Sequence, residues 1–165
     1  MNSQQIKVLG LDPGIDRLGW GIVEGKSFKD FQYISSGLIS SDKKQSSEMR
    51  LKEIYTDLVQ LIEIHQPTIV YAEELFFAKN VKTAMIVSEV RGVIKIAVQE
   101  GNCQYAEVHP RTLKKKITGV GNAQKQQIQY MLKQIFHFTQ DPKTDDVADA
   151  IAIAYVGFLE QVSRI

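Results

Sequence analysis

Residues 7–24 read KVLGLDPGIDRLGWGIVE and decide the fold of this 165-residue chain. The apolar run 8–11 has the length of a buried strand and ends in Asp12, directly before a Pro-Gly turn. A second apolar run, 18–23, follows, so the stretch predicts two neighbouring antiparallel strands with Asp12 at the end of the inner one. Asp12 could simply open the turn, since Asp is an ordinary turn residue. The functional alternative depends on whether other carboxylates reach the same place.

Three glycines surround this carboxylate, at positions 14, 19 and 21. Because glycine has no side chain, other groups can approach the backbone closely at these positions. We interpret the three glycines as room for a bulky, charged ligand beside Asp12.

The remaining sequence alternates strands with helices. An amphipathic helix is predicted at about 49–62, and a β-branched run at 68–72 then ends in Glu73-Glu74. This repeats the design of the opening stretch, in which a buried strand ends in acid. Three early strands followed by alternating helices and strands indicate one mixed α/β sheet with helices on its faces. The other predicted elements are strands at 6–11, 18–23, 31–39 and 104–108, a turn at 24–27, and helices at 81–99, from 110, at 123–136 and from 145.

Composition bounds the class of protein. With 44% apolar and 24% charged residues, the chain suits one globular domain spanning 1–165. No apolar run approaches the roughly 20 residues of a membrane span, and the first residues lack the features of a signal peptide. The single cysteine, Cys103, can form no intrachain disulfide, which fits a reducing compartment. We therefore expect a cytoplasmic protein without a membrane partner.

Positive charge is concentrated in one segment, although the formal net charge is only +1. Residues 108–140 contain no Asp or Glu. Such a segment is typical of a face that binds a polyanion, and the alternative is an ordinary solvated surface. The basic residues of this segment are Arg111, Lys114, Lys115, Lys116, Lys125 and Lys133.

The final predicted helix carries the strongest local signal. Asp146 and Asp149 are three residues apart and share one helix face, whereas we expect Asp145 to face elsewhere. A favourable contact with the helix dipole accounts for Asp145 and Asp146. It does not account for Asp149, because the Ala and Ile residues that follow predict burial, and a buried carboxylate needs a partner. No lysine or arginine is an obvious candidate.

We expect the partners to be Asp12 and Glu73, since both follow strands of the sheet that this helix covers. At about 4 Å and an effective dielectric constant near 20, each pair of carboxylates repels by roughly 4 kcal/mol, so the cluster implies cations. Oxygen ligands without cysteines or paired histidines favour Mg²⁺ or Mn²⁺ over zinc. Two such ions would support phosphodiester hydrolysis, one by activating water and the other by stabilising the leaving oxygen.

Two phenylalanines, Phe76 and Phe77, come shortly after Glu73. They could stack on bases or wedge between them, and burial in the core fits the pattern equally well. Together with the basic segment, they favour a nucleic-acid backbone as the substrate.

Five motifs occur in an order that resembles one known family. They are LGLDPG at 9–14, EELFFAKN at 73–80, VRGV at 90–93, GVGNAQK at 119–125 and DDVADAIAIA at 145–154. The chain resembles the RuvC family of bacterial Holliday junction resolvases from Val8 to about Val156. The resemblance implies a ribonuclease H-like, mixed five-stranded sheet with helices on both faces. It also implies a metal-dependent endodeoxyribonuclease, acting as a homodimer, that resolves four-way DNA junctions by paired symmetric nicks during recombination and repair.

The resemblance also implies roles for individual residues. The family's catalytic and metal-binding acids fall on Asp12, Glu73, Asp146 and Asp149, the four that the chemistry selects, with Mg²⁺ or a substituting Mn²⁺ as the ion and two ions per site. Some relatives carry histidine at position 146, and the aspartate here favours contact with metal. The base-contacting phenylalanine of the family matches Phe76. The predicted DNA-binding residues are Phe76, Phe77, Lys79, Arg111, Lys114, Lys115, Lys116 and Lys125.

Other interpretations remain open at this point. A generic ribonuclease H-like nuclease acting on another structured or hybrid nucleic acid would share the acids. A noncatalytic junction-binding module would keep the fold alone. A sugar-kinase or actin-like nucleotide binder needs a second lobe, for which 165 residues leave no room, and the chain has no complete Walker-type G-x-x-x-x-G-K-S/T motif, since the Gly25-Lys26-Ser27 run lacks the first glycine. The resemblance further implies the RuvA and RuvB branch-migration proteins as partners.

Overall fold

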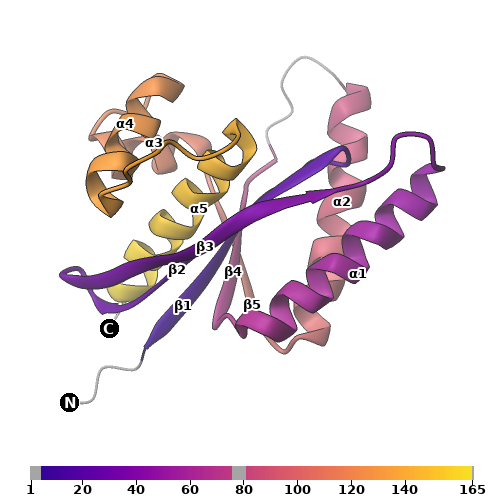
Figure 1. Cartoon of the computed structure of the whole chain (residues 1–165), viewed down its shortest axis with the longest axis horizontal. Helices are drawn as coiled ribbons and strands as arrows, with labels where there is room; N and C mark the ends of the chain where they lie inside the picture. The colour runs from indigo at the N-terminus through magenta and orange to yellow at the C-terminus, as the bar shows by residue number, and fades with distance from the viewer. Residues whose placement is uncertain (1–4, 76–80, 165) are drawn as a thin grey trace.

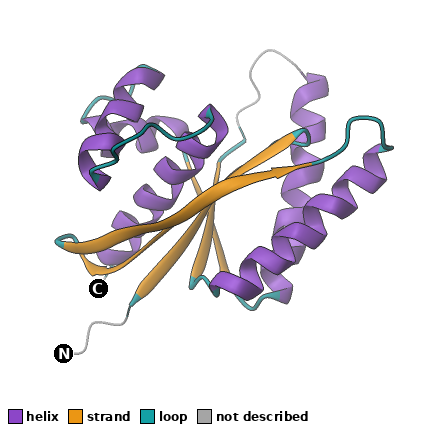
Figure 2. Cartoon of the chain, viewed as in Figure 1, coloured by secondary structure: helices purple, strands orange, loops and turns teal. Residues whose placement is uncertain are grey.

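The computed structural model describes residues 5–75 and 81–164. It contains a mixed five-stranded sheet, which lies between two helical layers (Figure 1, Figure 2). The strand order is β3-β2-β1-β4-β5. β1 and β3 are antiparallel to β2, whereas β1 is parallel to β4 and β4 to β5. The predicted mixed α/β sheet is therefore confirmed. The strands are β1 (Ile6–Asp12), β2 (Arg17–Ser27), β3 (Asp30–Ser40), β4 (Ile69–Glu73) and β5 (Gln104–Val108).

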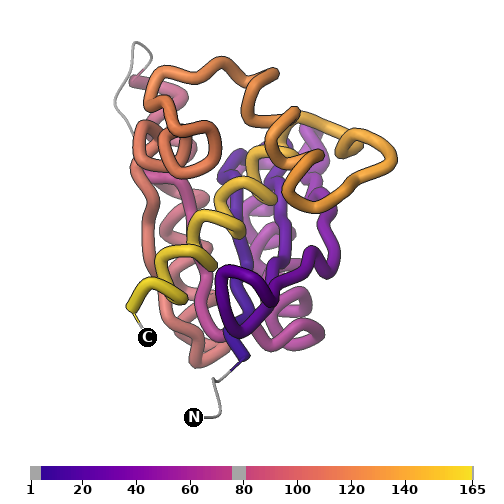
Figure 3. Tube along the Cα trace, turned by 90° about the vertical axis from the view of Figure 1, so that its left-hand side faces the viewer, coloured from indigo at the N-terminus to yellow at the C-terminus, as the bar shows by residue number. Residues whose placement is uncertain are grey.

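Each face of the sheet has its own hydrophobic core. On one face, α1 (Ser47–His65) and α2 (Val81–Glu100) cover the first core. On the other, α5 (Asp145–Val162) lies along the sheet over the second core, and α3 (Pro110–Thr118) and α4 (Lys125–Phe136) pack against it (Figure 3). Helices on both faces agree with the prediction.

The alternation of side chains along β1 and β4 decides which face the strand-end acids meet. Leu11 pairs with Ala72 across the two parallel strands, and both side chains belong to the core beneath α1 and α2. Successive side chains of a strand point to opposite faces. The next residues, Asp12 and Glu73, are therefore neighbours at the same end of the sheet, on the side that α5 covers.

Glycines allow α5 to lie directly on the sheet. A Cβ atom on Gly19 would come within 2.1 Å of the backbone oxygen of Asp146. Gly19 pairs with Asp12, so this close approach brings the start of α5 against the end of β1. A Cβ atom on Gly21 would likewise meet the α5 backbone, at 2.9 Å. The expectation that Gly19 and Gly21 leave room for a ligand is wrong, because α5 fills that space.

Most helix ends follow the predicted local signals. The Thr144 hydroxyl accepts a hydrogen bond from a backbone N–H at the start of α5, and Gly119 ends α3 with a φ of 80°, in the left-handed region. Two boundaries differ from the prediction. The hairpin of β2 and β3 continues through the predicted turn at 24–27, since its strands stay paired as far as Ser27 and Asp30. α4 begins at Lys125 rather than 123, because Gln124 caps it.

None of the helices within residues 5–75 and 81–164 is long and apolar enough to cross a membrane.

Candidate active site

The four predicted acids lie where α5 begins, next to the ends of β1 and β4. The raised pKa of Asp12 shows that the four acids lie close together. Burial, together with the negative charges of Asp149, Glu73 and Asp146, raises the pKa of Asp12 to about 7. The acids are therefore within electrostatic reach of one another, as the sequence predicted. A carboxyl group with a pKa near neutrality marks a place where negative charge is poorly compensated.

Two of the acids share a small cavity with two lysines. Glu73 and Asp149 line a cavity of about 180 Å³ together with Lys114 and Lys125. Burial raises the pKa of both carboxyl groups. The charge of Asp149 adds to this rise at Glu73, and the positive charge of Lys114 opposes it. The basic segment thus contributes directly to the acidic site.

Lys125 compensates negative charge at the start of α5. Its Nζ atom lies 2.8 Å from Oδ2 of Asp149 and 3.5 Å from Oδ2 of Asp145. Burial acts to lower the pKa of Lys125, but the hydrogen bond and charge of Asp149 outweigh it and raise the pKa. The expectations that no lysine or arginine pairs with Asp149, and that Asp145 faces elsewhere, are both wrong. Packing of α4 near α5 creates this contact, which sequence spacing could not indicate.

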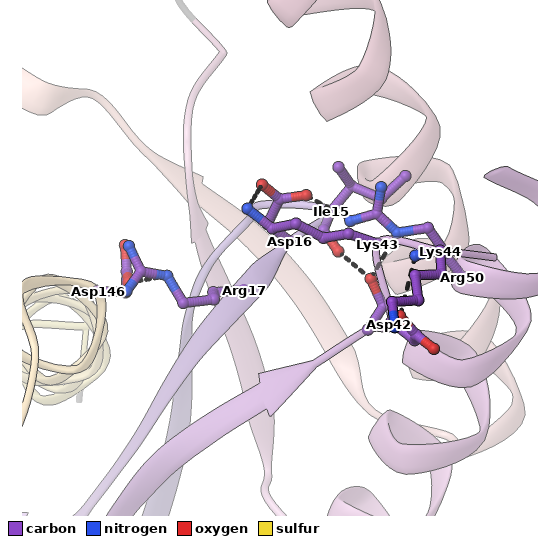
Figure 4. Close-up of polar contacts among 9 residues, drawn as sticks. Ile15, Asp16, Arg17, Asp42, Lys43, Lys44, Arg50 and Asp146 are labelled. Carbon is purple, nitrogen blue, oxygen red and sulfur yellow. Dashed lines mark hydrogen bonds and ion pairs between the residues drawn. The ribbon is translucent and has the colours of Figure 1, made fainter. Parts of the chain in front are cut away.

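Arg17 is a second cation at the site, and sequence reasoning missed it. Its Nε atom lies 3.2 Å from Oδ2 of Asp146, an ion pair whose geometry makes no hydrogen bond. The Arg17 side chain comes from the start of β2 and is 57% exposed. Figure 4 shows that the neighbouring Asp16 points away from α5, toward α1. The sequence held one indication of this role, because Arg17 comes directly after the turn that follows Asp12 and is the first residue of β2.

The loop between β1 and β2 is held by the start of α1 (Figure 4). Asp16 forms ion pairs with Arg50 and with Lys43, and hydrogen bonds from these two side chains lower the pKa of Asp16. The Ser41 hydroxyl donates to the backbone oxygen of Ile15 at 2.6 Å and accepts from Nε of Arg50 at 2.9 Å. The backbone just after the first acid is therefore fixed from the face of the sheet opposite α5.

The end of β4 has a comparable attachment. Arg91 on α2 is only 8% exposed, and its Nη1 atom donates a hydrogen bond to the backbone oxygen of Glu73. Its Nη2 atom lies 2.6 Å from Oε1 of Glu107 on β5. Sequence reasoning gave Arg91 no role. The available signal was its spacing of seven residues from both Ala84 and Val98, which places a charge in the buried stripe of α2.

The donor chemistry of the site suits a hard divalent cation. Carboxylate oxygens are the ligands that Mg²⁺ and Mn²⁺ prefer, and burial together with the neighbouring negative charges raises the pKa of Asp12. In the part of the chain that the structure describes, however, no three Asp, Glu, His or Cys side chains come close enough together to hold an ion. Lys125 and Arg17 neutralise Asp149 and Asp146 instead. The residues therefore fit a metal by type and location, with the protein's own cations compensating two of the acids.

The predicted DNA-binding residues do not form one surface, and Lys125 lies in the acidic cavity described above. Arg111, Lys114 and Lys115 line an open groove of about 960 Å³ at α3 and the loop that follows it. Lys116 belongs to a different surface, since its Nζ atom lies 3.2 Å from Oε1 of Glu160. The predicted DNA contacts that lie outside the described residues are Phe76, Phe77 and Lys79.

Comparisons with known proteins agree on one family. A family model described as "Crossover junction endodeoxyribonuclease RuvC" matches residues 8–156. The protein of that name from Caldicellulosiruptor saccharolyticus is 43% identical over 158 residues, which cover 96% of this chain and 95% of the relative. Its counterpart from Alkaliphilus metalliredigens is 46% identical over 149 residues, 89% of each chain.

Solved structures show the same fold. Thermus thermophilus RuvC superposes with a TM-score of 0.86 at 26% identity, over 96% of this chain and 97% of the other. T. thermophilus RuvC in complex with Holliday junction substrate gives a TM-score of 0.91 at 24% identity, over 96% of each chain. These matches confirm the predicted ribonuclease H-like fold.

Proposed function

Because this chain belongs to the RuvC family of crossover junction endodeoxyribonucleases, we propose that it resolves four-way DNA junctions by paired nicks in opposed strands during recombination and repair. The observation that best supports this proposal is the meeting of Asp12, Glu73, Asp146 and Asp149 beside a groove lined by basic residues. A cluster of acids alone would fit many kinds of nuclease and would not identify the substrate. The groove adds a surface for a polyanion next to them.

Nucleases of this family depend on metal ions. We propose that Mg²⁺, for which Mn²⁺ can substitute, is the ion here, that two ions bind, and that Asp12, Glu73, Asp146 and Asp149 hold them. When bound, the ions activate the attacking water and stabilise the leaving oxygen. Neutralisation of the buried carboxylates would also remove the repulsion that raises the pKa of Asp12.

The lysines of the shared cavity would bind the DNA backbone. Lys114 and Lys125 line the same cavity as Glu73 and Asp149, so a phosphate entering it meets positive charge from both α3 and α4. Such contacts position DNA without reading its sequence. The fixed ends of β1 and β4 then hold the acids in a constant position relative to that phosphate.

The test of this proposal is cleavage of an end-labelled synthetic four-way junction, compared with linear duplex and RNA–DNA hybrid, in Mg²⁺, Mn²⁺ or EDTA. We expect symmetric, metal-dependent nicks confined to the junction. Cutting of the hybrid instead would favour a generic ribonuclease H-like nuclease. Tight junction binding without cutting in either metal would favour a noncatalytic binding module.

Lys114→Ala is expected to weaken junction binding and to make it less dependent on salt. Loss of one phosphate contact should reduce the slope of log affinity against log salt concentration by about 0.9. Lys125→Ala should weaken binding as well. Junction affinity measured in EDTA across a salt series tests this, with Lys116→Ala as the comparison, because Lys116 lines neither the groove nor the cavity and pairs with Glu160. Unchanged slopes for both Lys114→Ala and Lys125→Ala would contradict the DNA-binding assignment.

We also propose that the protein is a homodimer and that α2 forms the interface. Three large apolar side chains of α2 are exposed in the single chain: Val81, Met85 and Ile96 are 72%, 64% and 57% accessible. Their spacings of four and eleven residues place them on one face of the helix, and exposed apolar residues gathered on one face mark an interaction surface.

Met85→Glu should therefore convert a dimer into a monomer, because a charge in an apolar interface must be desolvated. Size-exclusion chromatography with light scattering measures the mass directly. Ile64→Glu is the matched control, since Ile64 is 75% exposed on α1, outside the proposed interface. A monomeric wild type, or a Met85→Glu protein that remains dimeric, would rule out this interface.

The RuvA and RuvB branch-migration proteins are the partners that we propose beyond DNA, on the family resemblance alone. The proposed place of action is the cytoplasm, as the composition of the chain predicts. Co-purification of the three proteins on a four-way junction tests the partnership.

A further inference from the structure

Arg91 is the one charged residue in the described parts of the chain that is buried. A buried guanidinium group is costly unless its N–H groups are paired. Its partners lie near the ends of two neighbouring strands, of which β4 leads into the active site. Nη1 donates to the backbone oxygen of Glu73, the last residue of β4, and Nη2 lies 2.6 Å from a carboxylate oxygen of Glu107 on β5.

These two contacts bridge neighbouring strands. Glu107 pairs with Ala72 in the parallel β4–β5 register, one residue before Glu73. The pairing continues beyond the strand, since the N–H of Glu74 donates to the backbone oxygen of Val108 at 2.9 Å. A planar guanidinium has a rigid set of donors that can hold two acceptors at once. Arg91 therefore links the ends of β4 and β5 through a single side chain.

Arg91 approaches Glu73 from the face of the sheet opposite its carboxylate. The guanidinium comes from α2, whereas strand alternation directs the Glu73 side chain toward α5. The arginine thus leaves the carboxylate available for the reaction and contacts only its main chain. A group in this position controls where the carboxylate lies without taking up its oxygens.

We propose that Arg91 is a positioning residue for Glu73, fixing the backbone at the end of β4 and hence the direction in which this carboxylate meets the metal ions. The proposal rests on the proposed metal-dependent nuclease function. Partners that orient metal ligands typically change metal affinity or activity by about 10- to 100-fold when they are replaced.

The decisive variant is Arg91→Lys, which keeps the positive charge but loses the two-pronged donor geometry. Arg91→Met removes the charge as well. Lys95→Met is the matched control, because Nζ of Lys95 lies 3.5 Å from the same Glu107 oxygen while no contact to Glu73 is found for it among the described residues. All three full-length variants are compared with the wild type.

Three measurements separate positioning from simple structural support. Thermal melting reports folding, Mn²⁺ binding to the DNA-free protein is followed by electron paramagnetic resonance, and single-turnover cutting of a four-way junction gives the rate. We expect Arg91→Lys to melt cooperatively, to bind the junction like the wild type, and to lose about 10- to 100-fold in Mn²⁺ affinity or in cutting rate. Lys95→Met should match the wild type in each measurement.

The outcomes test the positioning role of Arg91 separately from the proposed junction-cutting activity. Wild-type Mn²⁺ affinity and cutting in Arg91→Lys would overturn the positioning role, even if its melting temperature fell. Equal losses in Lys95→Met would also overturn it, because the effect would then belong to Glu107. If the wild type cut no junction, the proposed function would fail, while weaker Mn²⁺ binding by Arg91→Lys would still support the role of Arg91. Should Arg91→Met fail to fold, Arg91→Lys decides alone.

Discussion

Asp12→Asn should bind a four-way junction as tightly as the wild type and cut it roughly 10³-fold more slowly. Asparagine keeps the shape of the side chain but cannot carry the negative charge of the carboxylate. The groove lined by Arg111, Lys114 and Lys115 is unchanged, so phosphate contacts should persist. Loss of rate without loss of affinity is the signature of a group needed in the reaction rather than in binding.

Single-turnover cutting in Mn²⁺ and junction affinity in EDTA measure the two quantities separately. Asp57→Asn is the matched control, since Asp57 is exposed on α1, on the other face of the sheet. A fully active Asp12→Asn protein would end the assignment of a metal site to these four acids.

The second large effect concerns stability. In the metal-free protein, the free energy of unfolding should fall as pH rises from about 4 to about 7. The pKa of Asp12 is about 7 in the folded state, against 3.8 for an unperturbed side chain. Within this range the folded protein therefore binds more protons than the unfolded chain, so raising the pH favours unfolding. Below about pH 4 the Asp12 carboxyl is protonated in both the folded and the unfolded protein, so it does not change the free energy of unfolding. Above about pH 7 it is ionised in both, and the folded protein is destabilised by the full cost of ionising the carboxyl in its buried position.

Asp12→Asn removes the contribution of Asp12 to this pH dependence because asparagine does not ionise. In EDTA at about pH 8, the variant should be more stable than the wild type by about 2–4 kcal/mol, and at about pH 4 the two should be similar. Urea denaturation across this pH range measures the difference. Added Mg²⁺ should narrow it at high pH by stabilising the wild type, since ligands that bind the folded state raise its stability. Parallel pH profiles in EDTA would show that Asp12 bears no such cost.

Both expected results follow from the same carboxylate, that of Asp12. The same carboxylate that the reaction requires makes the metal-free fold less stable, and its replacement should exchange activity for stability.

The sequence predicted the architecture and the proximity of the four acids because both follow from local patterns. Apolar runs that end in Asp12 and Glu73 define strands and place acid at their ends, and alternation then directs both side chains to one face. The spacing of Asp146 and Asp149 is likewise local. Each of these inferences needs only the period of a strand or a helix and the rule that a helix covers a sheet.

The cationic part of the site could not be predicted in this way. Lys125 reaches Asp149 because α4 packs near α5, and Arg17 reaches Asp146 because α5 lies on β2. Both contacts depend on how elements pack, which neighbouring residues in the sequence do not reveal. Gly19 was misinterpreted for the same reason, since a missing side chain indicates close approach but does not say what approaches.

The proposed active site draws its acids from β1, β4 and α5, so the earliest and latest elements of the fold must meet before it exists. Ribosomes build the chain from β1 onward, and α5 can settle on Gly19 only after it has left the exit tunnel. A nascent chain therefore carries Asp12 and Glu73 without Asp146 and Asp149. An incomplete product of translation, or one cut before α5 by a protease, would have no nuclease activity with which to damage the chromosome.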